Sequence, residues 1–355
     1  MRGVVETDGA EVFELLQARG LFAHDQRDTW FRYAAWAYWR NPYRGDRPPG
    51  WVIEEQGRIV AYVGCVFMPY RLGTWKGTGG SVENLTVDAS VRGPLAVVFT
   101  RKHLRADGAP VQFAGHFSAS GTLLWKPFRA AECGGTDATY VGVLSHRKFA
   151  AAKARQAGWA GRVAAAAQLP LLAVPFVSRR TGPAIRARST GRAVSVPRLS
   201  ELPADEVDAL CAGASAGLDA LVARDAAFLA WRYEARPDAP SFRYVAVRDS
   251  GRLVGLAVVQ DRGALDQRLY EFLVAPEAES VAQELLGGVV HLARENGGAL
   301  LLTKMVRPEL ADFWVANGFR RESKTANQYL IASALPEPMP SAPRTMYTYA
   351  EAKLW

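Results

Sequence analysis

Hydrophobic and polar positions change their period along the chain, and each period predicts a type of element. Around Thr29–Trp39 and Ala226–Glu234 apolar residues recur every three or four positions, which indicates amphipathic helices. Two runs of alternating or β-branched residues follow each helix and meet at "QG" (56–57) and at "DSG" (249–251). Because glycine permits the tight turn that joins antiparallel strands, we predict a β-hairpin at both places.

The same order of elements continues after each hairpin. A strand with an acidic residue, a helix, a buried strand, a short helix and a last strand follow in turn. In the first half the strand with the acid is "SVENLTVD" (81–88), the helix is 93–105 and the buried strand is "PVQFAGHF" (110–117). In the second half these elements are "RLYEFLVAP" (268–276), 279–296 and "GALLLTKM" (298–305). Strands that first form a meander and then alternate with helices predict a mixed α/β (α+β) fold, with a twisted central sheet in each half, flanked by helices.

Ordered pairs of similar residues relate the two halves, at separations between 188 and 194 positions. The pairs are Trp39-Arg40 with Trp231-Arg232, Gly57-Arg58 with Gly251-Arg252, Glu83 with Glu271, Phe128-Arg129 with Phe319-Arg320, and Tyr140 with Tyr329. Such a nearly constant offset indicates a duplication. We therefore predict two domains in tandem, 1–146 and 201–335, joined by a linker at 147–200 and followed by a Pro-containing tail at 336–355.

The composition is that of a globular protein, with 355 residues of which 49% are hydrophobic and 22% are charged. Three cysteines that lie far apart argue against a disulfide framework or a zinc site and suit a reducing cytoplasm. We expect neither a metal nor a tightly bound cofactor. The longest apolar run, 164–177, is interrupted by Gln168 and two prolines and is shorter than the roughly 20 residues of a spanning helix. We therefore predict a cytoplasmic protein without a transmembrane segment.

The positive charge is concentrated in one segment. The chain carries 43 Lys and Arg against 35 Asp and Glu, and residues 145–200 hold eleven of the basic residues and no acidic one. Two interpretations stay open: a solvated linker, or a site for a polyanion such as a tRNA, whose phosphates arginines would contact. The arginines that we predict to bind tRNA are Arg179, Arg180, Arg186, Arg188 and Arg192.

The order of elements, together with "GRIV" (57–60), "GRLV" (251–254) and "GFR" (318–320), resembles the GNAT (GCN5-related N-acetyltransferase) fold in a tandem of two copies. In that family a glycine-containing loop after the fourth strand binds the pyrophosphate of coenzyme A at a helix N-terminus. The resemblance places this loop at Arg92-Gly93 in the first copy. The second copy has no glycine there and carries two acids, Glu277 and Glu279. We therefore predict that only the first copy is active.

The resemblance also implies a chemistry. Acyl transfer to an amine requires a base, a polarised carbonyl and a proton for the leaving group. A carboxylate near the fourth strand serves as the base in the family, which implies Glu83. A regular strand directs Asn84 to the opposite face from Glu83, so that only one of these two candidates would face the substrate. Backbone N–H groups at Thr86, Val87 and Asp88 would polarise the carbonyl of the donor.

Neither copy has the tyrosine that the family uses as the general acid. His116 and Ser120 are the nearest polar candidates, although a histidine after the apolar "VQFAG" is equally compatible with a satisfied core residue. The aromatic helix at 28–39 is interpreted as core packing, or as a wall of an acceptor pocket. The sequence has no G-x-S-x-G elbow, no P-loop motif, no H-E-x-x-H and no cysteine pair with metal spacing.

Three functions remain open. The basic segment and the reduced glycine loop favour an aminoacyl-tRNA-dependent transferase, similar to the Fem-type enzymes. The second candidate is an acyl-CoA-dependent N-acyltransferase that acts through Arg92-Gly93, and the third is a non-catalytic tandem binding protein. For either enzyme we expect a small-molecule amine as acceptor, in natural-product or cell-wall biosynthesis.

Overall fold

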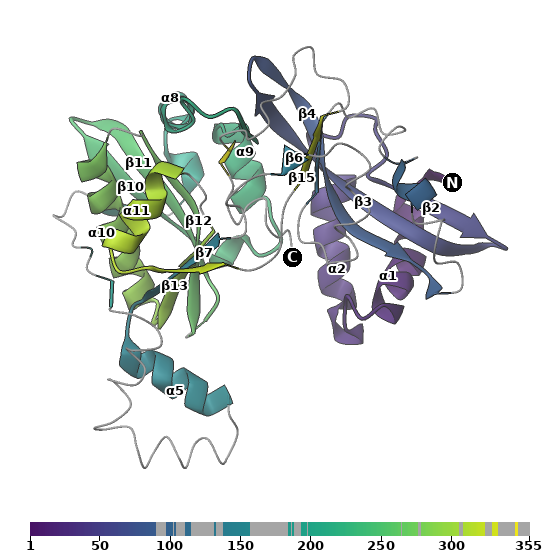
Figure 1. The fold of residues 1–355 in the computed structure, drawn as a ribbon, viewed down its shortest axis with the longest axis horizontal. Coiled ribbons are helices and arrows are strands. Elements are labelled where there is room, and N and C mark those ends of the chain that lie inside the picture. Colours follow the sequence, from purple (N-terminus) through teal and green to yellow (C-terminus); the bar gives the residue numbers. More distant parts are fainter. Residues whose placement is uncertain are drawn as a thin grey trace.

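The computed structural model places two β-sheets side by side, each covered by helices (Figure 1). The structure describes residues 1–89, 97–101, 103, 111–114, 131–132, 138–156, 184–185, 187, 193–196, 198–263, 265–275, 278–304, 308–323, 329–332 and 345–346. Both sheets mix parallel and antiparallel pairs, so the mixed α/β class predicted from the sequence is confirmed.

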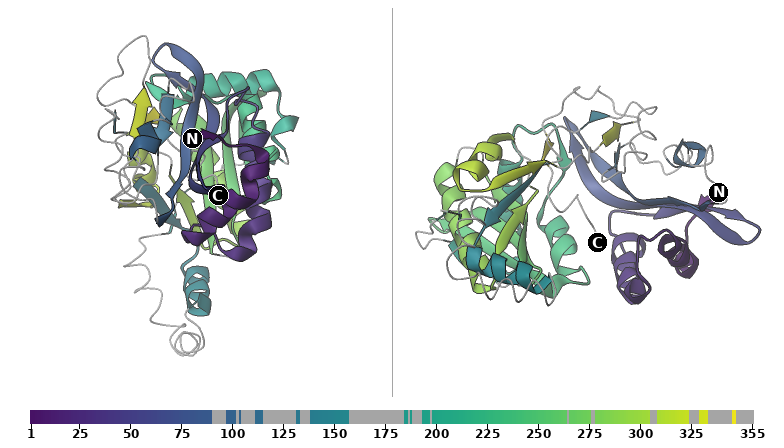
Figure 2. Two further views of the ribbon diagram at one scale, coloured as in Figure 1. Left: turned by 90° about the vertical axis from the view of Figure 1, so that its right-hand side faces the viewer. Right: turned by 60° about the horizontal axis from the view of Figure 1, so that its bottom comes forward.

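The first sheet is built around two long strands, β3 (Arg58–Leu72) and β4 (Trp75–Val87), which pair antiparallel. The order along its main path is β1 (Arg2–Gly3), β2 (Gly50–Glu55), β3, β4, β5 (Val111–Ala114), β15 (Tyr329–Ala332) and β6 (Ala131–Glu132). The helices on one side of this sheet are α1 (Gly9–Ala18), α2 (Arg27–Ala34) and the π-helix η3 (Ala35–Trp39) (Figure 2). Two short 3₁₀ turns, η1 (Glu6–Asp8) and η2 (His24–Gln26), precede α1 and α2.

Among the described residues the second sheet has seven strands, in the order β14 (Arg320–Ser323), β7 (Ala138–Val143), β13 (Leu300–Thr303), β12 (Asp266–Val274), β11 (Arg252–Asp261), β10 (Phe242–Asp249) and β8 (Ala193–Val196). Its helices are α8 (Ala204–Ala214), α9 (Ala226–Leu229), the π-helix η7 (Ala230–Glu234), α10 (Glu279–Glu295) and α11 (Pro308–Ala316), with the 3₁₀ turns η6 (Leu199–Glu201) and η8 (Ala239–Ser241). The helix predicted at 279–296 is confirmed by α10. Helix α5 (His146–Gln156) extends away from both sheets (Figure 1). In the part of the chain that the structure describes, no helix combines the length and the apolar character needed to cross a membrane.

The two sheets exchange strands. β7 lies in the first half of the sequence but pairs with β13 and β14 of the second sheet. Conversely, β15 lies near the C-terminus but pairs with β5 and β6 of the first sheet. β9 (Ala220–Val222) adds to β3, and β16 (Thr345–Met346) adds to β9. The two sheets therefore do not coincide with the sequence ranges 1–146 and 201–335.

Both predicted hairpins are present. Glu55 pairs with Arg58 and Asp249 pairs with Arg252, so that each loop has two residues. The loop residues have positive φ angles, 51° and 75° at Gln56-Gly57 and 49° and 84° at Ser250-Gly251. Two positive φ values are typical of the type I′ turn, whose twist matches that of the flanking strands.

The π-helices η3 and η7 correspond to each other in the two halves, since both begin Ala-Trp-x-Tyr. This pattern aligns Trp36 with Trp231 and Tyr38 with Tyr233, so the predicted pairing of Trp39 with Trp231 is wrong by three residues. Several tryptophans at helical spacing gave more than one way to align the copies. The rings of Trp36 and Trp231 stack with centroids 5.1 Å apart, and Nε1 of Trp36 donates a hydrogen bond of 3.1 Å to the carbonyl oxygen of Trp231. The equivalent elements thus meet where the halves join.

Candidate active site

Strand β4 extends beyond its parallel neighbour. It pairs with β5 only over Gly80–Val82 and continues to Val87, so Glu83 is the first residue past the paired region. In the second half β12 pairs with β13 as far as Leu269 and continues to Val274, so Glu271 lies two residues past the paired region. Gly64 of β3 pairs with Glu83, and its counterpart Val258 of β11 pairs with Glu271. The two acids thus pair with equivalent residues of the neighbouring strand, as the predicted duplication requires.

A β-bulge interrupts β4 directly after Glu83. Tyr62 pairs with Thr86 and Gly64 with Glu83, so two residues of β4 oppose a single residue of β3. Asn84 lies in the bulge with a φ of 55°, in the left-handed region that asparagine tolerates better than most residues. The expectation that Asn84 and Glu83 face opposite sides is therefore wrong. Nδ2 of Asn84 donates a hydrogen bond of 3.4 Å to the hydroxyl of Tyr38, whose pKa is raised by burial and, to a smaller extent, by the charge of Glu83.

Two buried tyrosine hydroxyls lie beside this carboxylate. Tyr38 of η3 and Tyr62 of β3 are hydrogen-bonded to each other and are each 1% exposed. Burial raises the pKa of both phenols well above the usual range, and the negative charge of Glu83 adds to the rise. A Cβ atom on Gly64 would lie 2.6 Å from the Tyr62 hydroxyl and 2.8 Å from that of Tyr38. Only a glycine at this position leaves room for the pair.

Glu83 is partly exposed, and the pKa of its carboxyl is shifted far from the ordinary value. Loss of solvation by burial raises the pKa of its carboxyl to about 7, while Arg232 and a hydrogen bond with Ser81 act in the opposite direction. Arg232 belongs to η7 of the second half, is fully buried, and its guanidinium lies 5.4 Å from the centre of the Trp36 ring. The carboxyl of the first half is thus influenced by a cation of the second, and it exchanges protons near neutral pH.

The equivalent carboxylate of the second half is held in place. Glu271 is fully buried, forms a salt bridge of 2.8 Å with Nε of Arg224, and accepts a hydrogen bond of 2.8 Å from the hydroxyl of Tyr233. A carboxylate paired with a buried guanidinium is stabilised in its charged form and is a poor proton acceptor. The duplicated acid therefore forms a buried ion pair in one half and has a raised pKa in the other.

Three backbone positions were predicted to bind the donor, and they lie at the end of β4. The N–H of Asp88 donates to the carbonyl of Val60 at 2.7 Å, and the hydroxyl of Thr86 donates to the carbonyl of Asn84 at 2.9 Å. Because alternate residues of an antiparallel strand turn their N–H groups to opposite sides, the N–H of Val87 points away from β3. Arg19 donates to the Val87 carbonyl at 2.8 and 3.1 Å and so fixes the peptide between Val87 and Asp88.

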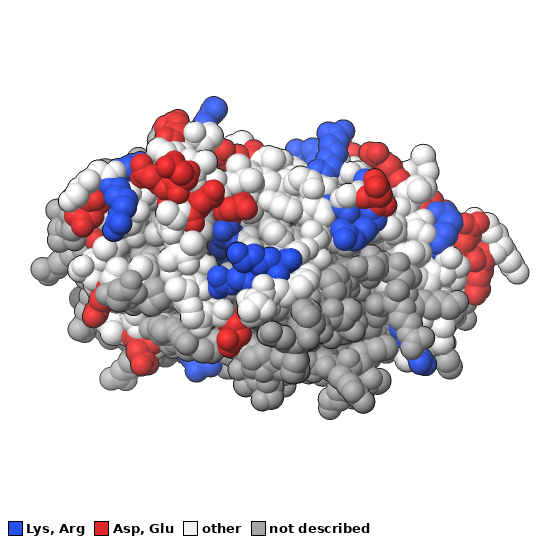
Figure 3. All heavy atoms as spheres, turned by 90° about the horizontal axis from the view of Figure 1, so that it is seen from above, with Lys and Arg blue, Asp and Glu red and all other residues white. Residues whose placement is uncertain are grey.

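Other predicted site residues lie outside the described part of the chain. They are Arg92 and Gly93 of the predicted donor loop, the acid candidates His116 and Ser120, and the basic residues Arg179, Arg180, Arg186, Arg188 and Arg192. On the face drawn in Figure 3, described basic side chains gather near the middle of the molecule and acidic ones lie mostly around them.

The sequence matches no model of a protein family and no curated protein. Solved structures do resemble it. The GCN5-related N-acetyltransferase from Kribbella flavida has a TM-score of 0.58 at 13% identity, over 94% of this chain and 71% of that chain. A probable N-acyltransferase from Enterococcus faecalis V583 has a TM-score of 0.58 at 9% identity, over 94% of this chain and 72% of that chain. The chain has the GNAT fold.

A third structure with this fold is more distant in shape. Saccharomyces cerevisiae N-myristoyltransferase with bound myristoyl-CoA and inhibitors has a TM-score of 0.53 at 12% identity, over 85% of this chain and 71% of that chain. Identities of this size show the fold alone, so the chemistry of this chain has to be argued from its own residues.

Sequence reasoning did not assign Tyr62 or Arg232 to a site, and it considered Tyr38 only as part of the aromatic helix at 28–39, as core packing or as a wall of an acceptor pocket. The repeated Ala-Trp-x-Tyr was a usable signal for Tyr38, because it places a tyrosine at one position of both copies. No local pattern connects Arg232 with Glu83, since the two lie in different halves of the chain. Among the described residues no three His, Cys, Asp or Glu side chains gather closely enough to hold a metal ion.

Proposed function

We propose that the protein is an N-acyltransferase and that its first half carries the reaction. The observation that carries this proposal is the carboxyl of Glu83, whose pKa is raised to about 7 at the end of the β4–β5 pairing. A base with a pKa near the working pH accepts a proton readily and is still largely ionised. The second half is not proposed as a catalyst, because Glu271 is held by Arg224 and Tyr233.

In the proposed reaction the Glu83 carboxylate takes one proton from the acceptor ammonium, directly or through a water molecule. The amine nitrogen then attacks the carbonyl carbon of the donor, and the N–H of Val87 stabilises the oxyanion that forms. The bond from carbon to the leaving sulfur or oxygen breaks, and the leaving group takes the second proton of the nitrogen. The amide keeps the third proton, and Glu83 releases its own to solvent, so that charge and atoms balance.

The neighbouring tyrosines have a supporting role in this scheme. Their raised pKa keeps Tyr38 and Tyr62 neutral at every pH at which the reaction would run. The hydrogen bond from Asn84 to Tyr38 fixes the bulge, and the bulge fixes the direction of Glu83 and of the backbone beyond it. We therefore regard Asn84, Tyr38 and Tyr62 as positioning residues.

An acyl-CoA is the donor that we propose. The support is the shared fold of N-myristoyltransferase, a protein solved with myristoyl-CoA bound, and the backbone N–H of Val87 at the end of β4. Aminoacyl-tRNA is the second candidate, and it is favoured by the run of eleven basic and no acidic residues at 145–200. The acceptor that we propose is a small-molecule amine of a biosynthetic route.

The proposal is tested by supplying donors and following the amide. The protein is incubated with a panel of acyl-CoA thioesters and, separately, with a pool of aminoacyl-tRNAs, each together with a mixture of amines, and products are identified by mass spectrometry. We expect an amide with an acyl-CoA donor and a loss of about 100-fold or more in rate for Glu83→Gln. The matched control, Glu14→Gln, removes an exposed carboxylate of the same half and should leave the rate unchanged. Absence of any amide with both donor classes would leave the non-catalytic binding protein as the correct function.

A further inference from the structure

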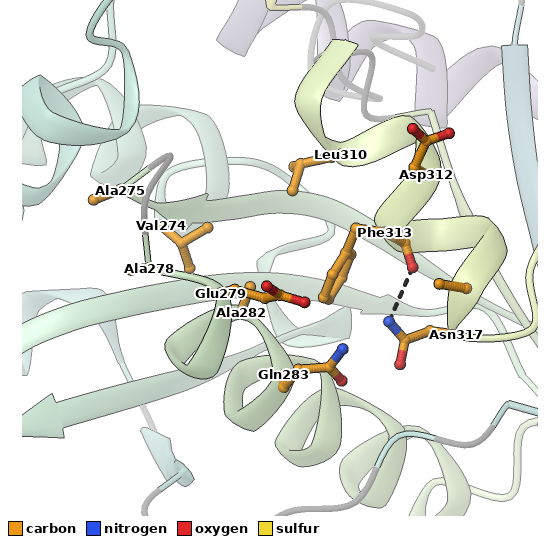
Figure 4. A pocket seen from close by; sticks show the side chains of 11 residues that line it. Val274, Ala275, Ala278, Glu279, Ala282, Gln283, Leu310, Asp312, Phe313 and Asn317 are labelled. Carbon is orange, nitrogen blue, oxygen red and sulfur yellow. Dashed lines mark hydrogen bonds between the residues drawn. The ribbon is translucent and has the colours of Figure 1, made fainter.

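The second half holds a cavity of about 350 Å³ that is separate from the site around Glu83. It lies where β12 ends and α10 begins, and α11 forms its other side (Figure 4). Its apolar part is made by side chains such as Val274, Ala282, Leu310 and Phe313. A volume of this size falls near the lower end of the range for small-molecule sites.

Every polar side chain that lines this cavity offers an oxygen acceptor. Glu279 and Gln283 come from the first turns of α10, while Asp312 and Asn317 come from α11 and the residue that follows it. None of the described residues around the cavity is a lysine or an arginine. The lining therefore attracts a hydrogen-bond donor with positive charge.

Two of these acceptors are not used within the described chain. Asn317 is only 5% exposed, and its Nδ2 donates to the carbonyl of Phe313 at 2.9 Å, which leaves Oδ1 without a donor from any described residue. Gln283 is half-buried, and the described residues make no hydrogen bond to its side chain. Both amide oxygens are therefore available to accept hydrogen bonds from a ligand that brings N–H groups into the cavity.

An anion would bind poorly in the same place. The N-terminus of α10 would ordinarily favour a phosphate, but Glu279 occupies its first turn and Asp312 lies across the cavity. The predicted loss of the phosphate site in the second copy rested on Glu279 as well as on Glu277, which lies outside the described residues. The cavity thus has the wrong charge for coenzyme A and the right charge for a cation.

We propose that this cavity binds a small organic cation, namely a primary ammonium carried on a short apolar chain. An ammonium has three N–H donors and no acceptor, so it suits a lining whose polar side chains all offer oxygen acceptors. The apolar carbons would pack against Phe313 and Ala282. No residue of the Glu83 site takes part, so this binding does not depend on the proposed acyl transfer.

The test uses three probes with the same six-carbon chain and a different charge: hexylamine, hexanol and hexanoate. Their binding to the full-length protein is measured by ligand-observed NMR at neutral pH. Two exposed carboxylates, each contributing a factor of about three, should make hexylamine bind about tenfold more tightly than hexanol, and hexanoate should bind most weakly. Equal affinity for the amine and the alcohol, or displacement of hexylamine by coenzyme A, would overturn the proposal.

Substitutions of the lining residues test whether hexylamine binds in this cavity. Glu279→Gln combined with Asp312→Asn should weaken hexylamine about tenfold and leave hexanol unchanged. The control Glu295→Gln removes an exposed carboxylate at the other end of α10 and should change neither probe. Ala316→Leu, at an exposed position that lines the cavity, should exclude both probes without lowering the unfolding temperature. Unaltered hexylamine binding in these cavity variants would show that the amine binds elsewhere and would refute the assignment.

Discussion

Glu83 lowers the free energy of unfolding by an amount that depends on pH, so the effect of its substitution on stability can be predicted. Burial raises the pKa of its carboxyl from an ordinary value of 4.5 to about 7, so the folded chain binds this proton more tightly than the unfolded chain does. Between these two pH values the unfolded state has released the proton and the folded state has kept it. The free energy of unfolding therefore falls by about 1.4 kcal/mol per pH unit over this window, and by about 3 kcal/mol in total.

Substitution of Glu83 by Gln preserves the shape of the side chain and removes the charge. Near pH 4.5 the carboxyl is neutral in the folded protein, so Glu83→Gln should match the native chain in stability. At pH 8 the variant should be more stable by about 2 to 3 kcal/mol, since it no longer holds a desolvated charge. Urea unfolding of both proteins at the two pH values, with Glu14→Gln as the exposed control, measures this difference. A stability difference that is the same at both pH values would refute the raised pKa of Glu83.

Three further variants test the surroundings of the two acids. Glu271→Gln leaves Arg224 buried without its carboxylate and should destabilise the protein by about 3–5 kcal/mol in urea unfolding, whereas a loss below about 1 kcal/mol would contradict the structural role of this pair. Gly64→Ala should displace the two neighbouring tyrosine hydroxyls and lower kcat in the amide assay about tenfold or more, and a normal kcat would show that their placement is unimportant. Arg232→Met removes the cation that lowers the pKa of Glu83, so the acid limb of the pH–rate profile should move to higher pH; a limb that stays in place would contradict their coupling.

Local sequence patterns were sufficient to predict much of the fold. The two hairpins follow from glycine-containing turns between alternating runs, because a type I′ turn needs residues that tolerate positive φ. The correspondence of Glu83 and Glu271 follows from the repeated order of elements, and the strand register agrees with it. These features depend on neighbours in sequence, which is why a single sequence contains them.

Features that depend on distant contacts were not predictable in this way. The exchange of β7 and β15 between the sheets leaves no local trace, since an apolar strand has the same pattern in either sheet. The bulge at Asn84 reverses the side expected from regular alternation, and one extra residue is enough to do so. Arg232 reaches the site from the other half, so only the tertiary fold brings it close to Glu83.

The most direct measurement for the central claim is the pH dependence of kcat/KM for amide formation by the full-length protein. If Glu83 is the base, kcat/KM should rise through an apparent pKa of about 7 and level off above it. Glu83→Gln should lose this rise together with most of the activity, and Glu14→Gln should retain both. An unchanged pH profile and rate in Glu83→Gln would contradict the account, because the proton would then be taken by another group.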